Sequence, residues 1–109
     1  MERRTPETKR KKMIQLKDAL QDAQTKFTDV RTTQEFQSGH FPGAANIPLD
    51  ALMDYTDELK ELHKPVVVYC RSGARSASAA MLLKDAGLEN VFNGGGLENL
   101  LVLTQKNLN

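Results

Sequence analysis

The single cysteine of the chain is followed closely by two arginines, and this pattern predicts a reactive thiolate. Arg71 comes directly after Cys70, and Gly73 and Arg75 follow within five residues. A thiol reacts as its thiolate, and with an ordinary pKa of about 8.5 it is mostly protonated at neutral pH. Two guanidinium charges and the amides of a glycine-containing loop would stabilise that anion. A buried cysteine is often only a small apolar residue, but that role requires neither arginine. We therefore predict that Cys70 is a nucleophile.

The segments on either side of Cys70 predict a strand and a helix that would position it. Residues 66–69, after Pro65, are β-branched or aromatic, which indicates a strand buried on both faces. Residues 77–83 are rich in Ala, Met and Leu, which predicts a helix that begins near Ser76. Open α/β sheets bind ligands where the carboxyl end of a strand meets a helix N-terminus. The N-terminal amides and dipole of that helix would favour an anion there.

The remaining chain alternates between strand and helix patterns. We predict strands over residues 27–30, 44–47 and 91–93, and helices over residues 13–24 and 97–103. Thr32 and Glu35 offer a capping box for a short helix through Phe36. Residues 49–62 predict one or two helices with a break near residues 55–56, and the helix after Ser76 should end at Gly87. This alternation predicts an α/β fold whose parallel sheet is covered on both faces.

Length and charge bound the organisation of the chain. At 109 residues with 39% hydrophobic content, it can form one compact domain. Residues 1–12 carry a net charge of +4, which leaves −3 for the remainder. We interpret residues 1–12 as a basic, disordered leader without an assigned function, and residues 13–109 as the domain.

Composition also argues against several function classes. The net charge of +1 gives no reason to expect nucleic acid as a partner, and no apolar run approaches the roughly 18 residues of a membrane span. One cysteine cannot form an internal disulfide, so we expect a cytoplasmic protein, unless an export signal has been removed. The two histidines and one cysteine are widely spaced and predict no metal site.

Several motifs, in the same order, resemble those of rhodanese domains. They are the segments 29–31 (Asp-Val-Arg), 35–36 (Glu-Phe), 39–48 (Gly-His-Phe-Pro-Gly-Ala-Ala-Asn-Ile-Pro), 67–76 (the cysteine strand and loop) and 93–97 (Asn-Gly-Gly-Gly-Leu). The resemblance covers roughly residues 14–101 and is closest to small single-domain sulfurtransferases of the phage-shock-protein E type. It implies a three-layer α/β/α rhodanese-like fold with a central, mostly parallel sheet of about four to five strands.

The resemblance also implies a reaction. Cys70 would take the outer sulfur of a small anionic donor such as thiosulfate, forming a persulfide, and pass it to cyanide, a thiol or a protein acceptor. No cofactor is implied, and we expect a monomer. The chain has no second cysteine to resolve the persulfide, so the acceptor must come from outside. Asp29, Arg31 and His40 would support the site. The residues implied in substrate binding are Arg71, Ser72, Gly73, Ala74, Arg75 and Ser76.

Two other functions compete with sulfur transfer. The first is a cysteine-dependent phosphatase or an arsenate reductase, enzymes that share related folds. Phosphatases that use a cysteine nucleophile carry the pattern Cys-x5-Arg, a loop wide enough for a tetrahedral phosphate. Here Arg75 comes one position earlier and Ser76 occupies the Cys-x5 position, which argues against that class. The second alternative is a non-catalytic binding or sulfur-relay module. The intact loop around Cys70 argues against a retired site, although fold alone does not settle function.

Overall fold

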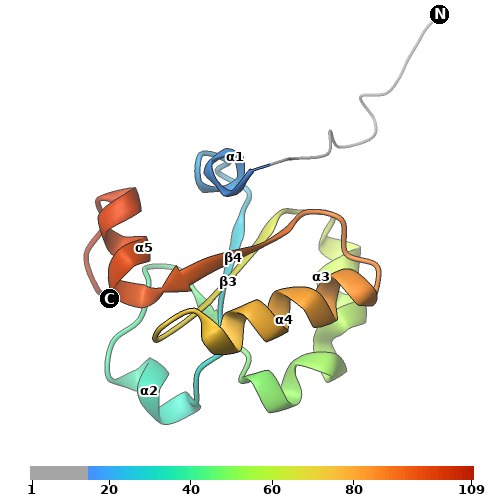
Figure 1. Cartoon of the computed structure of the whole chain (residues 1–109), viewed down its shortest axis with the longest axis horizontal. Coiled ribbons are helices and arrows are strands. Elements are labelled where there is room, and N and C mark those ends of the chain that lie inside the picture. Colours follow the sequence, from blue (N-terminus) through green and yellow to red (C-terminus); the bar gives the residue numbers. More distant parts are fainter. Residues whose placement is uncertain (1–14) are drawn as a thin grey trace, which may run out of the picture.

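The computed structural model describes residues 15–109, and Figure 1 shows their arrangement along the chain. Strands and helices alternate from one end to the other. In chain order they are α1 (Leu16–Leu20), β1 (Lys26–Asp29), α2 (Thr33–Gln37), β2 (Ala45–Asn46), the 3₁₀-helix η3 (Leu49–Tyr55), α3 (Thr56–Leu62), β3 (Val66–Cys70), α4 (Ala74–Asp85), β4 (Val91–Gly96) and α5 (Leu97–Thr104).

The described strands form one four-stranded sheet in the order β2-β1-β3-β4. All three neighbouring pairs are parallel, so the α/β prediction with about four strands is confirmed. Asp29 at the end of β1 pairs with Tyr69, and Cys70 at the end of β3 pairs with Gly96. The carboxyl ends of β1, β3 and β4 therefore meet at one edge of the sheet, beside Cys70.

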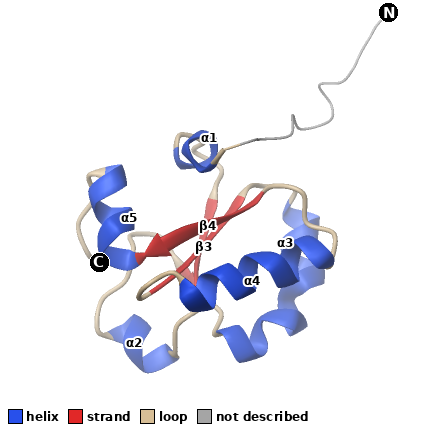
Figure 2. Ribbon diagram, viewed as in Figure 1, coloured by secondary structure: helices blue, strands red, loops and turns tan. Residues whose placement is uncertain are grey.

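Helices cover both faces of this sheet, as Figure 2 shows. On one face, η3, α3 and α4 pack on alternate side chains of β3, which include Val66, Val68 and Cys70. On the other face, α1 and α5 pack around Tyr69, whose neighbours include Phe41 and Leu100. All five residues of β3 are buried, as the uninterrupted apolar run predicted. The core thus fixes Cys70 through the most buried strand in the described chain.

Local capping signals are confirmed where they act within a few residues. Thr32 caps α2 by accepting a hydrogen bond from the backbone N–H of Glu35, and the Glu35 carboxylate accepts from the Thr32 N–H. The predicted break near residues 55–56 is the junction of η3 with α3. Helix α4 gives way to Gly87, which has a φ of +107°.

Three predicted boundaries are wrong. The helix expected over residues 13–24 ends at Leu20, because the Thr25 hydroxyl donates to the Ala19 carbonyl at 2.6 Å and turns the chain toward β1. Helix α4 begins at Ala74, before Ser76, because Gly73 already supplies its N-cap. Strand β4 continues past residue 93 through the three glycines, the last of which, Gly96, pairs with Cys70 of β3. Residues 13–14 and the predicted leader over 1–12 lie outside the described residues. No helix within residues 15–109 is long and apolar enough to cross a membrane.

Candidate active site

The Cys70 sulfur lies inside a tight loop between β3 and α4. Cys70 is fully buried, and its Sγ accepts a hydrogen bond from the Gly73 N–H at 3.0 Å. Gly73 has a φ of +103°, a left-handed conformation that side-chain-bearing residues rarely adopt, and this turns its amide back toward the sulfur. Because Gly73 is also the N-cap of α4, the positive end of the helix dipole lies at the same place.

These contacts change the acidity of the thiol. Burial by itself would raise the pKa of Cys70, since it disfavours the thiolate. Hydrogen bonds from the Ser76 hydroxyl and from the amides of Ser76, Gly73 and Ser72 outweigh burial and lower the pKa to about 7. A substantial fraction of Cys70 is therefore the nucleophilic thiolate at neutral pH.

Ser76, in the first turn of α4, links the sulfur to Asn93 of β4. The buried Ser76 Oγ lies 3.5 Å from Cys70 Sγ and 2.6 Å from Asn93 Oδ1. The Asn93 carboxamide in turn donates from Nδ2 to the Gly73 carbonyl at 3.2 Å and accepts from the Gly95 N–H at 2.9 Å. One carboxamide therefore connects the cysteine loop, the first turns of α4 and the glycine-rich end of β4.

The three glycines of β4 allow that strand to lie directly on the cysteine loop. Between the pairs Val68–Asn93 and Cys70–Gly96, β4 spans one residue more than β3, an irregularity of the kind that re-aims side chains near sites. A Cβ on Gly96 would lie 2.5 Å from the Arg71 carbonyl oxygen, which no side chain could accommodate without movement of the backbone. A glycine is therefore required at position 96, because β4 approaches the backbone of the cysteine loop closely there.

Arg75, predicted to bind an anion, forms a two-point ion pair with Glu35 of α2. Its Nη1 donates to Oε1 at 2.8 Å and its Nη2 donates to Oε2 at 3.0 Å. The Arg75 guanidinium, together with the Thr32 N–H, lowers the pKa of Glu35 to about 2. Both side chains are partly exposed, at 37% and 29%, so the pair remains accessible to a competing anion. The other predicted binding residues, Arg71, Ser72 and Ala74, lie exposed on the outside of the loop.

Asp29 and Arg31 form a buried pair behind the site. Asp29 is fully buried and accepts from Arg31 Nε at 2.9 Å and from Nη2 at 2.6 Å. Arg31 also donates to the Gly39 carbonyl at 2.7 Å, and its guanidinium lies 5.8 Å from the centre of the Tyr69 ring. The pair therefore fastens the loop after α2 to the sheet edge beside Cys70.

His40 contacts Phe36, four residues before it in the chain. Its Nδ1 lies 3.0 Å from the Phe36 carbonyl oxygen, and its ring stacks on Phe36 with the two centroids 3.8 Å apart. The next residue, Phe41, donates its N–H to the Tyr69 hydroxyl at 2.9 Å. These contacts order the turn that follows α2. In the described part of the chain, no group of three or more His, Cys, Asp or Glu is arranged to hold a metal ion.

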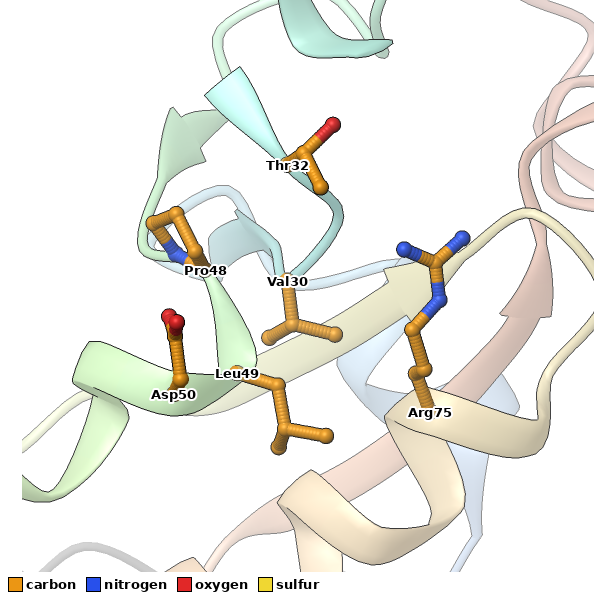
Figure 3. Close-up of a pocket in the computed structure, with 6 residues that line it drawn as sticks. All are labelled: Val30, Thr32, Pro48, Leu49, Asp50 and Arg75. Carbon is orange, nitrogen blue, oxygen red and sulfur yellow. The ribbon is translucent and has the colours of Figure 1, made fainter. Parts of the chain in front are cut away.

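A pocket of about 420 Å³ adjoins the loop at the sheet edge (Figure 3). Val30 and Leu49 lie between Arg75 on one side and Pro48 and Asp50 on the other. Thr32 completes the lining. The pocket thus offers apolar walls next to one cationic and one acidic side chain.

The rhodanese-like domain family matches residues 13–100 in a comparison with protein families. The chain is a member of that family. It is 34% identical over 73 residues to the thiosulfate sulfurtransferase PspE of Escherichia coli, with 66% of this chain and 70% of PspE covered. A solved structure described as a rhodanese with anions from E. coli superimposes with a TM-score of 0.65 at 33% identity, covering 69% of this chain and 89% of that one.

Other rhodanese-like relatives carry different names. A tRNA uridine(34) hydroxylase of Erwinia tasmaniensis is 33% identical over 94 residues, which cover 80% of this chain but 27% of the hydroxylase. The chain spans about half or less of the length of the first curated relatives that it matches. Family membership therefore establishes the domain and leaves its substrates to be argued from the site.

Sequence reasoning misses the roles of two residues of this rhodanese-like site. The sequence pattern indicates Glu35 as a capping residue of α2 and part of a family motif, and its partner Arg75 lies 40 positions away. It indicates Asn93 only as part of a strand and a glycine-rich turn, and its partner Ser76 lies 17 positions away. The asparagine directly before three glycines is the available signal, because the register of β4 on β3 brings that position to the loop.

Proposed function

We propose that this rhodanese-like protein is a thiosulfate or persulfide sulfurtransferase that carries the sulfur on Cys70. The observation that supports the proposal best is the Gly73 N–H at 3.0 Å from Cys70 Sγ, at the N-cap of α4. The Ser76 hydroxyl, together with this donor and the Ser76 and Ser72 amides, lowers the pKa of the thiol to about 7 and stabilises negative charge on sulfur.

The proposed reaction has two displacements. The Cys70 thiolate attacks the outer sulfur of thiosulfate; the new S–S bond forms as the old one breaks, and its electron pair leaves with sulfite. Cys70 then carries a persulfide anion. An external thiolate or cyanide attacks the terminal sulfur of this persulfide and takes it, and the electron pair of the broken S–S bond returns to Cys70 as thiolate. Covalent catalysis divides one transfer into two easier steps, and no redox cofactor is needed for balance.

The cations near the loop support an anionic donor. Arg71 is exposed at the rim, and Arg75 is accessible beside the pocket of Figure 3. For Arg75 to bind thiosulfate, the donor must compete with the Glu35 carboxylate for the same N–H groups. Since Cys70 is fully buried, the loop must also open enough to admit the donor sulfur.

The size of the loop favours sulfur over phosphate. Arg75 stands at the Cys-x4 position, and the amides around Sγ come from three residues, Ser72, Gly73 and Ser76. A loop this short provides less room for a tetrahedral phosphate or arsenate than the Cys-x5-Arg loop of phosphatases. Hydrolysis of an aryl phosphate by the purified protein would favour the phosphatase or arsenate-reductase alternative.

A sulfur-relay module is the second candidate, because some relatives are much longer than this chain. The chain covers only 27% of the tRNA uridine(34) hydroxylase that it resembles, so a rhodanese-like domain can be part of a larger activity. An enzyme should turn over repeatedly with thiosulfate and cyanide, whereas a relay module should load Cys70 once and discharge only to its protein partner. The similarity to PspE favours the enzyme.

The proposed partners follow from the same chemistry. The donor is a small sulfur anion, and the acceptor is an external thiol, because the sequence contains no second cysteine. A protein that works with one free thiol fits a reducing compartment, and we propose the cytoplasm. We also propose that the protein acts as a monomer.

Intact mass after brief exposure to thiosulfate tests the proposal. The wild type should gain one sulfur atom and lose it on addition of cyanide, and Cys70→Ser should gain none while keeping its fold. The absence of any gain in a wild type whose Cys70 can still be alkylated would contradict sulfur transfer. If the sulfur is gained, steady-state production of thiocyanate separates the enzyme, which turns over repeatedly, from the relay module, which does not.

A further inference from the structure

The Asn93 carboxamide has a fixed orientation at the site. Its Nδ2 group donates to the Gly73 carbonyl, and its Oδ1 accepts from the Gly95 N–H. In the reversed orientation, Nδ2 would face the Gly95 N–H, a second donor, and Oδ1 would face the Gly73 carbonyl, a second acceptor. Oδ1 therefore faces Ser76, and it can only accept a hydrogen bond there.

This orientation decides where the Ser76 proton lies. A serine hydroxyl has one proton, and Ser76 Oγ has two neighbours, Asn93 Oδ1 at 2.6 Å and Cys70 Sγ at 3.5 Å. The shorter contact joins two oxygens that must share a proton, so Ser76 donates to Asn93. A lone pair of Ser76 Oγ then faces the sulfur and can accept from a thiol S–H.

A thiolate requires the opposite arrangement. The Ser76 hydroxyl lowers the pKa of Cys70 only by donating to the sulfur, and for that its proton must leave Asn93. We propose that Asn93 is a positioning residue that competes with the Cys70 sulfur for the Ser76 proton during sulfur transfer. When Cys70 loses its own proton to solvent, the hydroxyl rotates and donates to the thiolate; when the persulfide forms, charge moves to the outer sulfur and the hydroxyl returns to Asn93.

This inference rests on the proposed function, because sulfur transfer is what alternates the charge on Sγ. It adds a balance between two states. The Ser76 hydroxyl stabilises the attacking thiolate by donating to it, and it donates to Asn93 again once the inner sulfur is neutral. Without that competition the thiolate would be held more tightly, and a more acidic thiol is a weaker nucleophile.

Other charges near Cys70 stay in place when Ser76 or Asn93 is replaced. They are Arg71 in the loop, Arg75 at the start of α4 with its partner Glu35 of α2, and the Asp29–Arg31 pair at the end of β1. Residues 91–96 of β4 include no charged residue. Changes in acidity that depend on both Ser76 and Asn93 can therefore be assigned to their contact.

The test is a double-mutant cycle on the pKa of Cys70, read from the ultraviolet absorbance of the thiolate with Cys70→Ser as the blank. Asn93→Ala should lower the pKa by roughly 0.5 to 1, because Ser76 is then free to donate to sulfur. In the Ser76→Ala background the same substitution should change the pKa by no more than about 0.3. Asn99→Ala, the same change at an exposed position of α5, is the matched control and should leave the pKa unchanged.

Two results would overturn the inference. One is a rise in pKa in Asn93→Ala, and the other is an equal shift with and without the Ser76 hydroxyl; both indicate that Asn93 only supports the loop. If Asn93→Ala does not fold, NMR of the wild type gives the answer. The Asn93 side-chain amide signals should titrate with Cys70, and a titration of equal size in Ser76→Ala would refute the competition.

The same samples separate this inference from the proposed function. Thiosulfate exposure and intact mass report persulfide formation, whereas the absorbance titration reports only proton position. If the double-mutant cycle shows the Ser76-dependent change in pKa but the wild type gains no sulfur, the sulfurtransferase proposal is overturned and the hydrogen-bond competition is retained. If the wild type gains sulfur but the cycle shows no Ser76-dependent change in pKa, only the competition is overturned.

Discussion

Arg75 and Glu35, 40 positions apart, meet through two hydrogen bonds at 2.8 and 3.0 Å beside the cysteine loop. The pair joins the first turn of α4 to the first turn of α2, so it fastens one wall of the site to the loop. It also occupies the guanidinium that an anionic donor would use. Glu35 therefore orients Arg75, and it would compete with the proposed anionic donor for the same N–H groups.

We predict that Glu35→Gln strengthens the binding of thiosulfate. Glutamine can still complete the capping box with Thr32, but it carries no charge to hold Arg75. Since exposed ion pairs contribute about 0.2–1 kcal/mol, KM for thiosulfate should fall roughly 1.5- to 5-fold with little change in kcat. Steady-state kinetics measure this, with Glu58→Gln, an exposed residue in the first turn of α3, as the control. A higher KM in Glu35→Gln would show that Glu35 mainly orients Arg75 for the donor.

The same pair predicts acid sensitivity. The pKa of Glu35 is about 2 in the folded protein, below its ordinary value of 4.5. A carboxylate with a lowered pKa contributes stability that is fully present above its unfolded-state pKa and is lost as pH falls toward the folded value. The free energy of unfolding should therefore decline between about pH 5 and pH 2 more steeply in the wild type than in Glu35→Gln. Urea unfolding across this range measures it, and parallel curves for the two proteins would contradict the ion pair.

The sequence predicts the cysteine strand and its loop well, but it does not predict which side chains meet around them. Residues 66–70 and the following loop are predictable because a buried strand, a glycine turn and a helix are each encoded in contiguous residues. The contact of Arg75 with Glu35 joins separate elements, and no periodic pattern records which rotamers meet there. The first helix is shorter than its apolar pattern predicts, because the hydroxyl of Thr25, outside that pattern, caps its end.

Cys70 should show a pH-dependent reactivity that its burial makes selective for small reagents. Its pKa of about 7 lies below that of a free cysteine, so the thiolate fraction, and with it the rate of alkylation by iodoacetamide, should rise with pH and reach half its maximum at about pH 7. Because the residue is fully buried, a bulky maleimide should react more slowly relative to iodoacetamide than it does with a free thiol. Stopped alkylation followed by mass spectrometry gives both rates. A midpoint near the pKa of a free cysteine would show that the loop amides do not stabilise the anion.

Gly96→Ala should damage both stability and sulfur transfer, because the added Cβ would lie 2.5 Å from the Arg71 carbonyl oxygen. The strand and the cysteine loop would have to separate, and overpacking of this kind costs about 1–3 kcal/mol. We expect a lower unfolding midpoint in urea together with slower persulfide formation.

Gly43→Ala separates the steric effect of that change from backbone strain. Gly43 has a φ of +80°, but nothing lies within 4 Å of the position that an added Cβ would take. The substitution therefore costs only the left-handed backbone penalty of about 1–2 kcal/mol. Its unfolding midpoint should fall while persulfide formation proceeds at the wild-type rate. If Gly96→Ala retained that rate as well, the close packing of β4 on the loop would not be needed to hold the amides around Cys70. The Gly73 N–H would then have to keep its position on the sulfur through α4 alone.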